Sequence, residues 1–488
     1  MLAAFSRFCG TSTPARRRGP SRLAAATLVT GLVAAGVLSG AGVAAAGEEA
    51  QGQGGATAML GGLKTYGEAV IHGDDGDLKV AAGLFEMSVE GGGMLQTYCI
   101  DMHNPTQKDA KYEETPWSGT SLGTNKEAGK IRWILQNSYP QVNDLAALAK
   151  RAGVGGLTEQ DAAAGTQVAI WRYSDGADVD AVGARAEKLA DYLEKSARDM
   201  AEPRASLTLD PPAVSGHPGM RLGPVTVRTN ARGVTVVPPA DATTSGVRIV
   251  DEKGKAVTSA KNGSRLYFDV PKDTAAATGG ATSPAPGGAS GTAALTVQAS
   301  TTVPVGRAFA SESRSQTQIL AGSSESTVSA TASATWAEKG PIPALSARKN
   351  CAAGGVDISA ANTGDKPFTF ELMGDEHTIP AGTSRTVTIP LQEDQPYDFT
   401  ITGPNGFSQR FTGVLDCKTQ GSEAGTSTQT LAEPSPATVG GTPGGTTNLA
   451  ATGGYSATPV ITGVAIGLVV IGGAVLVVLR RRESPTAD

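Results

Sequence analysis

Hydrophobic positions between residues 55 and 200 recur first with the period of a β-strand and then with that of a helix. The stretch AVIHGDDGDLKVAAGLFEMSVEGGGMLQTYCID (69–101) alternates as strands do and is interrupted by Gly and Asp turn residues. The segments EAGKIRWILQNSYP and DAVGARAEKLADYLEKSARD then place apolar residues on one helical face. These residues are Ile131, Ile134, Leu135, Val182, Ala186, Leu189 and Leu193. The order predicts an α+β domain with strands first and helices after.

The pattern changes near residue 204, where the helical periodicity ends. Short β-rich runs separated by turn residues continue to Trp336, which predicts a β-sandwich at 204–340. An insert rich in Gly, Ala, Pro and Ser near 272–292 interrupts it and is expected to be a mobile loop. A second, smaller all-β domain is predicted at 346–418. The chain is therefore expected to be multidomain.

The first 46 residues indicate an export signal. Arginines precede an uninterrupted apolar stretch at 23–40, and small residues at 44–46 favour cleavage before Gly47. The arginine run is also compatible with the twin-arginine export route. RRRGPS, however, lacks the apolar residues expected just after the two arginines of that signal. The protein is expected to be secreted, with both export routes left open.

The C-terminal end carries three features in order. A Thr, Ser, Gly, Ala and Pro linker at 419–448 leads to LAATGG, and then to an uncharged apolar run at 459–479 that is just long enough to span a membrane as a helix. Three arginines follow it, as the positive-inside rule expects of a cytoplasmic tail. A plain membrane anchor is one interpretation of this end.

The same order resembles the cell-wall sorting signal of Gram-positive bacteria, in a variant with Ala at the second position. The motif residues are Leu449, Ala450, Ala451, Thr452 and Gly453. The resemblance implies that a sortase cuts between Thr452 and Gly453 and joins Thr452 covalently to peptidoglycan. The sorting signal then spans 449–488, and its transmembrane helix is present only before cleavage.

Removal of both ends would leave a mature chain of residues 47–452. That chain has 33 basic and 44 acidic residues, a net charge near −11. A surface this acidic repels polyanions, which argues against nucleic acid as a partner.

Three cysteines remain once Cys9 is lost with the export signal. Cys351 and Cys417 bracket the second β domain, and exported proteins meet an oxidising environment, so these two are predicted to form a disulfide. Closing so long a loop contributes about 4 kcal/mol in the chain-entropy model. Cys99 is left unpaired, and a single cysteine in a secreted chain needs an explanation.

Three interpretations of Cys99 are an inert thiol, an intermolecular disulfide and the nucleophile of a cysteine hydrolase. It could be an inert buried thiol or form an intermolecular disulfide. A cysteine hydrolase needs a histidine base, but His103 would lie about 13 Å away along a strand, and no hydrolase motif accompanies the more distant His72. Four scattered histidines offer no zinc spacing, so no metal site is predicted.

A fourth interpretation is an internal thioester, formed when a thiolate attacks the carboxamide of a nearby Gln and expels ammonia. QTYCID supplies Cys99 and TQVAIW supplies Gln167. Thr158 and Asp161 form a predicted capping pair for the helix that carries Gln167. The neighbours of Gln167 at helical spacing are Ala163, Ala164, Ile170 and Trp171. Trp171 and Tyr98 are expected to shield the bond from water.

The pair YCID and TQVAIW, about 70 residues apart and followed by a sorting signal, resembles the thioester (TQxA) domain of Gram-positive surface adhesins. The likeness covers roughly residues 55–200, and IRWILQNSYP resembles the intervening helix of actinobacterial members. It implies a spontaneous thioester between Cys99 and Gln167, held between a β part and a helical part. It also implies supporting roles for Tyr98, Thr166, Ala169, Ile170 and Trp171.

The expected organisation follows in chain order. It comprises a signal peptide (1–46), an α+β thioester domain (47–203), two sandwich-like stalk domains (204–340 and 346–418), a disordered linker (419–448) and the sorting signal with its transmembrane helix (449–488).

The resemblance implies covalent capture of an amine at the Gln167 acyl carbon, with Cys99 leaving as a thiolate. Because the chemistry is single-turnover, the protein is not expected to be an enzyme, and no cofactor is expected. Tyr98, Asp101 and His103 are close enough in sequence to tune the site. Expected partners are sortase, peptidoglycan and an amine-bearing target that the sequence does not identify. The alternative is a structural cell-wall protein in which the thioester only locks the domain.

Overall fold

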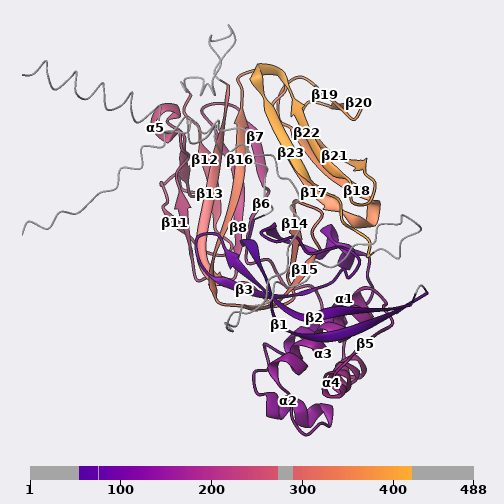
Figure 1. The fold of residues 1–488 in the computed structure, drawn as a ribbon. Helices are drawn as coiled ribbons and strands as arrows, with labels where there is room; N and C mark the ends of the chain where they lie inside the picture. The colour runs from indigo at the N-terminus through magenta and orange to yellow at the C-terminus, as the bar shows by residue number, and fades with distance from the viewer. Residues whose placement is uncertain (1–53, 75, 273–289, 420–488) are drawn as a thin grey trace, which may run out of the picture. The chain divides into compact units, whose positions relative to one another are not determined.

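The computed structural model describes residues 54–74, 76–272 and 290–419, which all fall within one compact unit (Figure 1). The export signal, the sorting signal and most of the insert near 272–292 lie outside these residues, as does nearly all of the linker. No helix in the described part is both long and apolar enough to cross a membrane. The span predicted at 459–479 lies outside the described residues.

A seven-stranded sheet carries the strands predicted at the N-terminus and closes on itself. Its order is β2-β3-β15-β14-β4-β1-β5, and β2 also pairs with β1. Its strands are β1 (Thr57–Gly73), β2 (Gly76–Val89), β3 (Met94–Cys99), β4 (Lys111–Thr115), β5 (Val179–Ala181), β14 (Ala308–Ser311) and β15 (Gln318–Ser323). β1 is long enough to pair with β4 near its start and with β5 near its end, while β2 pairs along its length.

Four helices lie between β4 and the sandwich, in agreement with the predicted order of strands before helices. They are α1 (Ala128–Asn137), α2 (Leu145–Ala152), α3 (Glu159–Ser174) and α4 (Ala184–Ser196), preceded by the short 3-10 helices η1 (Trp117–Gly119) and η2 (Ser121–Gly123). Val182 was predicted to lie on the apolar face of the helix that forms α4, but this prediction was wrong because its side chain is exposed. Val182 precedes the helix, and its backbone N–H donates to Glu68 O at the edge of β1.

The range 204–340 contains a two-sheet sandwich and an excursion out of it. One sheet has the order β10-β12-β8-β6 and the other β11-β9-β13-β16-β7, and a shared apolar core lies between them. The elements are β6 (Leu207–Asp210), β7 (Ala213–Gly216), β8 (Arg221–Thr229), β9 (Val234–Val237), α5 (Ala242–Ser245), β10 (Arg248–Val250), β11 (Ser259–Ala260), β12 (Arg265–Asp269), β13 (Gly291–Thr302) and β16 (Glu325–Trp336).

The excursion departs from the continuous domain ranges expected from the sequence. β13 and β16 pair along twelve residues, and the chain between them leaves the sandwich to insert β14 and β15 between β4 and β3. The helical domain and its sheet are therefore completed by residues about 200 positions downstream. Short apolar runs do not reveal which sheet they join, so the sequence pattern placed them in the sandwich.

A buried ion pair fixes β14 in this sheet. Arg307 Nε donates to Glu114 Oε1 at 2.9 Å, and both side chains are almost completely buried. Glu114 also accepts from the backbone N–H groups of Ala56 and Ser206, and Arg307 reaches Glu202. Because every charge has several partners, the pair joins the sheet to the segment that enters the sandwich.

The C-terminal β domain forms one three-stranded sheet and two hairpins around a phenylalanine-rich core. Its elements are β17 (Pro343–Asn350), η3 (Cys351–Ala353), β18 (Gly355–Asn362), β19 (Phe368–Leu372), β20 (Asp375–Ile379), β21 (Thr383–Pro390), β22 (Pro396–Thr402), η4 (Pro404–Gly406) and β23 (Ser408–Val414). The structure contains a disulfide between Cys351 and Cys417, the pair expected to bond, with Cα atoms 5.1 Å apart.

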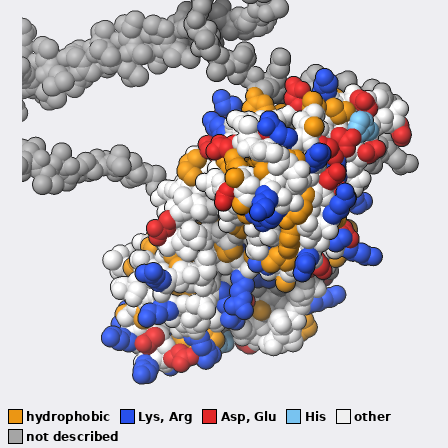
Figure 2. Space-filling view, turned by 90° about the horizontal axis from the view of Figure 1, so that it is seen from below, with side chains coloured by type: hydrophobic (Ala, Val, Ile, Leu, Met, Phe, Trp, Pro, Cys, Tyr) orange, Lys and Arg blue, Asp and Glu red, His pale blue; other side chains and the backbone are white. Residues whose placement is uncertain are grey.

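Figure 2 shows basic and acidic side chains interspersed over one face of the molecule.

Candidate functional site

Cys99 and Gln167 come from the two halves of the N-terminal domain. Cys99 is the last residue of β3 and pairs with Gln318 of β15. Gln167 lies in the middle of α3, whose first turn is held by the predicted capping box: Asp161 N donates to Thr158 Oγ1 and Thr158 N donates to Asp161 Oδ2. The fold therefore brings these two residues to one place.

The small residues before Gln167 allow α3 to pack tightly on both sides. Ala164 lies so close to Gly67 of β1 that a Cβ added at Gly67 would sit 3.0 Å from it. A Cβ added at Gly165 would lie 2.4 Å from Ala186 O of α4, a distance that real structures do not tolerate. The run AAAG therefore permits α3 to lie between the strands and α4.

The Gln167 carboxamide is held by the backbone of Cys99. Cys99 N donates to Gln167 Oε1 at 3.0 Å, and Gln167 Nε2 donates to Cys99 O at 2.8 Å. Cys99 is 1% exposed and Gln167 is fully buried. The two bonds orient the carboxamide beside the cysteine, and burial excludes the water that would hydrolyse a thioester.

The Cys99 sulfur lies in the turn after β3. Asp101 N donates to the sulfur at 3.4 Å, and the sulfur lies 3.3 Å from Asp101 O, which can accept its proton. Burial, followed by the negative charge of Asp175, raises the pKa of the Cys99 thiol well above its usual value. Interactions with the Trp171 indole and with the Asp101 backbone oppose that rise. At neutral pH the free thiol is therefore protonated.

Three carboxyl groups with raised pKa values surround this turn. Burial raises the pKa of Asp101 to about 7, with Asp416 and Asp175 adding to it. Burial likewise raises the pKa of Asp175 to about 7 and that of Asp416 to about 6. Asp101 also accepts hydrogen bonds from His103 N and Asn104 Nδ2, so it bonds the turn and is not solvated. These groups can exchange protons near neutral pH.

The remaining motif residues are packed around the pair. Thr166 Oγ1 donates back to Ala162 O at 2.7 Å, and Tyr98 Oη donates to Tyr139 O at 2.9 Å. Ala169 and Ile170 are fully buried, and Trp171 is 5% exposed. The aromatic side chains of Tyr98 and Trp171 thus belong to the same apolar core as Cys99.

The two histidines considered as bases do not contact the sulfur. Among the described residues, no hydrogen bond joins the His103 ring to Cys99, and burial lowers the pKa of His103. His72 instead bonds Asp77 and Asp180 at the surface. Neither histidine forms a thiolate–imidazole pair with Cys99.

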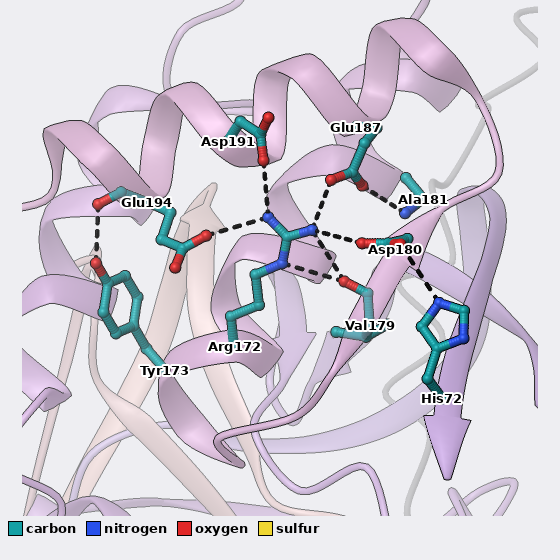
Figure 3. A network of polar contacts seen from close by, with 9 residues as sticks. All are labelled: His72, Arg172, Tyr173, Val179, Asp180, Ala181, Glu187, Asp191 and Glu194. Atoms are coloured by element: carbon teal, nitrogen blue, oxygen red, sulfur yellow. Dashed lines mark hydrogen bonds and ion pairs between the residues drawn. The ribbon is translucent and has the colours of Figure 1, made fainter.

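Arg172, directly after Trp171, anchors α3 against its neighbours (Figure 3). Its guanidinium bonds three carboxylates of α4 and both Val179 O and Asp180 of β5. The α4 partners are Glu187, Asp191 and Glu194. Arg172 lies five residues after Gln167 on the same helix. This network therefore fixes the rotation of α3 about its axis and its position along that axis, and so fixes the place of the carboxamide.

Sequence reasoning missed the contribution of distant segments to the site. Thr317, next to the partner of Cys99 in β15, donates through Oγ1 to Asp416 at 2.6 Å. Thr419 Oγ1 donates to Ser174 O, at the end of α3, at 3.4 Å. Residues 416–419 therefore link the β half of the site to its helical half. No local motif marks these residues, because the contacts depend on the packing of separate domains.

One group of acids near this segment lies close enough together to hold a cation. Carboxylate oxygens of Glu393, Asp394 and Asp416 lie within 4.8 Å of one another, the one such cluster in the described part of the chain. Glu393 is also occupied as the acceptor for Cys417 N and Lys418 N. These bonds give the cluster a structural role at the disulfide without any ion.

Comparison with known proteins agrees with this geometry in the N-terminal domain. Residues 96–199 match the family model described as "Thioester domain", so the resemblance to thioester domains is confirmed over that stretch. Residues 343–414 match the model "Bacterial phospholipase C, C-terminal domain". Comparison with curated proteins gives no match.

Two solved structures are similar to parts of the chain. The Bacillus anthracis TIE protein is 15% identical, with 74% of this chain and 81% of that chain covered and a TM-score of 0.26. The thioester domain of the Enterococcus faecium TIE86 protein is also 15% identical, with 58% of this chain and 97% of that chain covered and a TM-score of 0.26.

Proposed function

We propose that this protein forms an internal thioester between Cys99 Sγ and the side-chain carbonyl carbon of Gln167, and uses it to capture amines on a target surface. The observation that carries the proposal is the pair of hydrogen bonds between the Gln167 carboxamide and the Cys99 backbone in a buried site. The thioester-domain match of residues 96–199 supports it.

Formation of the bond exchanges one leaving group for a better one. The Cys99 sulfur attacks the Gln167 carbonyl carbon, the C–N bond to Nε2 breaks, and ammonia leaves with the proton that the thiol gives up. The Cys99 N–H points at Gln167 Oε1, where negative charge develops in the tetrahedral intermediate. Burial raises the pKa values of the nearby Asp101 and Asp175 to about 7, a value suited to a group that passes a proton between thiol and amine.

Capture runs through the same carbon. A neutral amine on the target attacks the Gln167 acyl carbon, the C–S bond breaks, and an amide joins the two partners. The electron pair goes to the Cys99 sulfur, which takes up the proton that the amine loses. The stored reactivity comes from the thiolate, which is a far better leaving group than ammonia. Each molecule reacts once and does not regenerate, so the protein is proposed not to be an enzyme.

The proposal includes secretion and attachment to the cell wall. In it, a sortase recognises 449–453 and joins Thr452 to peptidoglycan, and the β-sandwich, without its β14–β15 excursion, and the β domain at 346–418 hold the thioester domain away from the wall. Replacing Thr452 by Ala tests this part. The variant should move from the wall fraction to the membrane or the medium, and unchanged wall attachment would count against a sortase route.

A second function is favoured by the burial of both partners. Cys99 and Gln167 are at most 1% exposed, so a nucleophile reaches them only if the surrounding segments move. If they do not move, the thioester serves as an intramolecular lock of a structural surface protein.

Intact-mass spectrometry of the secreted protein tests both functions. The native chain should be one ammonia lighter than its sequence, and methylamine should add to it. Gln167→Glu and Cys99→Ala serve as matched controls that have no carboxamide or no thiol.

A chain of full mass with a titratable thiol would contradict the thioester. A light chain that methylamine cannot modify would favour the lock. Native protein incubated with cultured cells should give conjugates that survive boiling in detergent, and the Cys99→Ala variant should give none.

A further inference from the structure

We propose that the Trp171 indole N–H is a donor to the Cys99 sulfur as it leaves during amine capture, and thereby helps to set the rate of that step. This inference rests on the proposed function and names a residue that acts directly on the reacting sulfur. In the sequence, Trp171 is explained by shielding alone. The structure gives its N–H a separate role.

The first observation is that the indole nitrogen is buried without a conventional partner. Trp171 Nε1 has no hydrogen bond of standard geometry, whereas Trp117 Nε1 donates to Gly306 O at 2.9 Å. Trp336 Nε1 is also unpartnered, but it lies in the sandwich core, away from Cys99. An unpaired buried donor costs free energy, so its retention beside a nucleophile calls for a function.

The second observation is the direction of the indole. Trp171 lies one turn after Gln167 on α3, so both side chains project from one face of the helix. Trp171 and Cys99 pack in the same apolar core, and the indole lowers the pKa of the Cys99 thiol against the effect of burial. The contact falls short of a hydrogen bond in the thiol state, and a negatively charged sulfur would attract the N–H more strongly.

The chemistry of capture creates the charge that this donor meets. When the C–S bond breaks, its electron pair passes to sulfur in a buried site where Asp101 and Asp175 disfavour further negative charge. The Tyr112 hydroxyl is the other titratable group that interacts with this sulfur. In the described part of the chain, two N–H donors oppose that repulsion, Asp101 N at 3.4 Å and the Trp171 indole.

The two ends of the breaking bond therefore each have a donor. Cys99 N donates to the oxygen of the Gln167 carbonyl, Asp101 N donates to the sulfur, and the unpaired Trp171 indole lowers the pKa of the same sulfur. Since the indole has no competing acceptor, no bond must break before it reaches the thiolate. Donors placed in advance where charge develops lower the barrier more than donors that must first reorganise.

Trp171→Phe tests the inference because it keeps an aromatic ring and removes the N–H. We expect the variant to form the thioester and to add methylamine about tenfold more slowly than the native protein, as for loss of one charged hydrogen bond. Trp336→Phe removes the other unpartnered indole N–H and should leave the rate unchanged. Equal rates for the Trp171→Phe and native proteins would overturn the inference.

A second measurement separates donation from packing. In the Gln167→Ala background, where Cys99 stays a thiol, far-ultraviolet absorbance against pH gives the thiolate titration. Trp171→Phe should move that titration to higher pH, and an unmoved titration would contradict the contact. Because this readout needs no thioester, failure of the proposed function and failure of this inference give different results.

A third measurement covers a variant that does not fold. The indole N–H resonance of Trp171 in the native protein should move downfield when methylamine opens the site at a pH where Cys99 ionises. A resonance that stays in place through opening and titration would show that the indole only packs.

Discussion

Two cysteine-containing regions of this protein join segments that are far apart in sequence, and they do so in different surroundings. Cys351 and Cys417 are 66 residues apart and pack with Leu391 and Leu415. Cys99 and Gln167 are 68 residues apart and lie among backbone donors and carboxyl groups. Both regions are buried, so burial alone does not distinguish them.

The difference lies in the polar groups that face each pair. A disulfide forms when an oxidant removes two electrons, and apolar neighbours protect it afterwards. An acyl transfer moves charge from sulfur to oxygen and back, and it needs donors at both atoms. Around Cys99, N–H groups donate both to the sulfur and to the Gln167 oxygen, whereas beside the disulfide the Glu393 carboxylate accepts from Cys417 N and Lys418 N.

The largest expected effect comes from removing the acyl group. Gln167→Glu keeps the size of the side chain but replaces the carboxamide with a carboxylate, a poor acyl donor. We expect complete loss of the ammonia-deficient mass and of methylamine addition, while the Cys351–Cys417 disulfide stays intact. Mass spectrometry with and without reductant measures both sites in one sample. A variant that still adds methylamine would place the acyl group elsewhere.

A large effect on stability is expected from breaking the buried ion pair. Arg307→Ala leaves Glu114 charged and buried, which should lower the free energy of unfolding by about 3 to 5 kcal/mol. Urea unfolding measures the loss. Arg410→Ala breaks an exposed pair with Asp398 and should change little.

The ion-pair variant also sharpens the comparison of the two cysteine regions. β14 and β15 place Gln318 opposite Cys99, so loosening this insertion should reduce thioester yield. The disulfide lies in a separate core and should form as before. Equal loss at both regions would show that the two are not independent.

Removing the disulfide should have the next largest effect. Cys351→Ser with Cys417→Ser opens a long loop, and the chain-entropy model gives a loss of about 4 kcal/mol. The same change frees residues 416–419, which bond Thr317 and Ser174 at the two halves of the thioester site. Methylamine should therefore add faster to the double variant than to the native protein. An unchanged rate would show that this segment does not limit access to the thioester.

Much of the candidate site could be predicted from short motifs, whereas its surroundings could not. The capping box of Thr158 and Asp161 depends on local chemistry that the sequence displays directly, and Cys99 and Gln167 are found from the short motifs that carry them. The raised pKa of Asp416 and the pairing of β15 with β3 depend on segments brought together by packing. A periodic pattern reports which face of a strand is buried, but not against which partner.

The smallest expected effect is a change in pH dependence. Burial raises the pKa of Asp175 in the folded protein to about 7 from an ordinary value of 3.8, so between these values the folded state binds more protons than the unfolded state. The free energy of unfolding must then fall as pH rises from about 4 to 7. Asp175→Asn removes this contribution while keeping an oxygen for Met102 N, so its stability should vary less with pH.

Thermal unfolding at pH 5 and pH 8 measures the Asp175 effect. Relative to native protein, Asp175→Asn should gain stability at pH 8 and gain less or nothing at pH 5. Asp101 and Asp416 have raised pKa values of their own, so a slope of the same sign should persist in the variant. The double serine variant frees Asp416, which contributes to this slope, so its slope should be shallower than that of the native protein. If the stabilities of the native and Asp175→Asn proteins changed equally between pH 5 and pH 8, water would have to reach this carboxyl. The surroundings of the two cysteine regions would then differ less than their packing indicates.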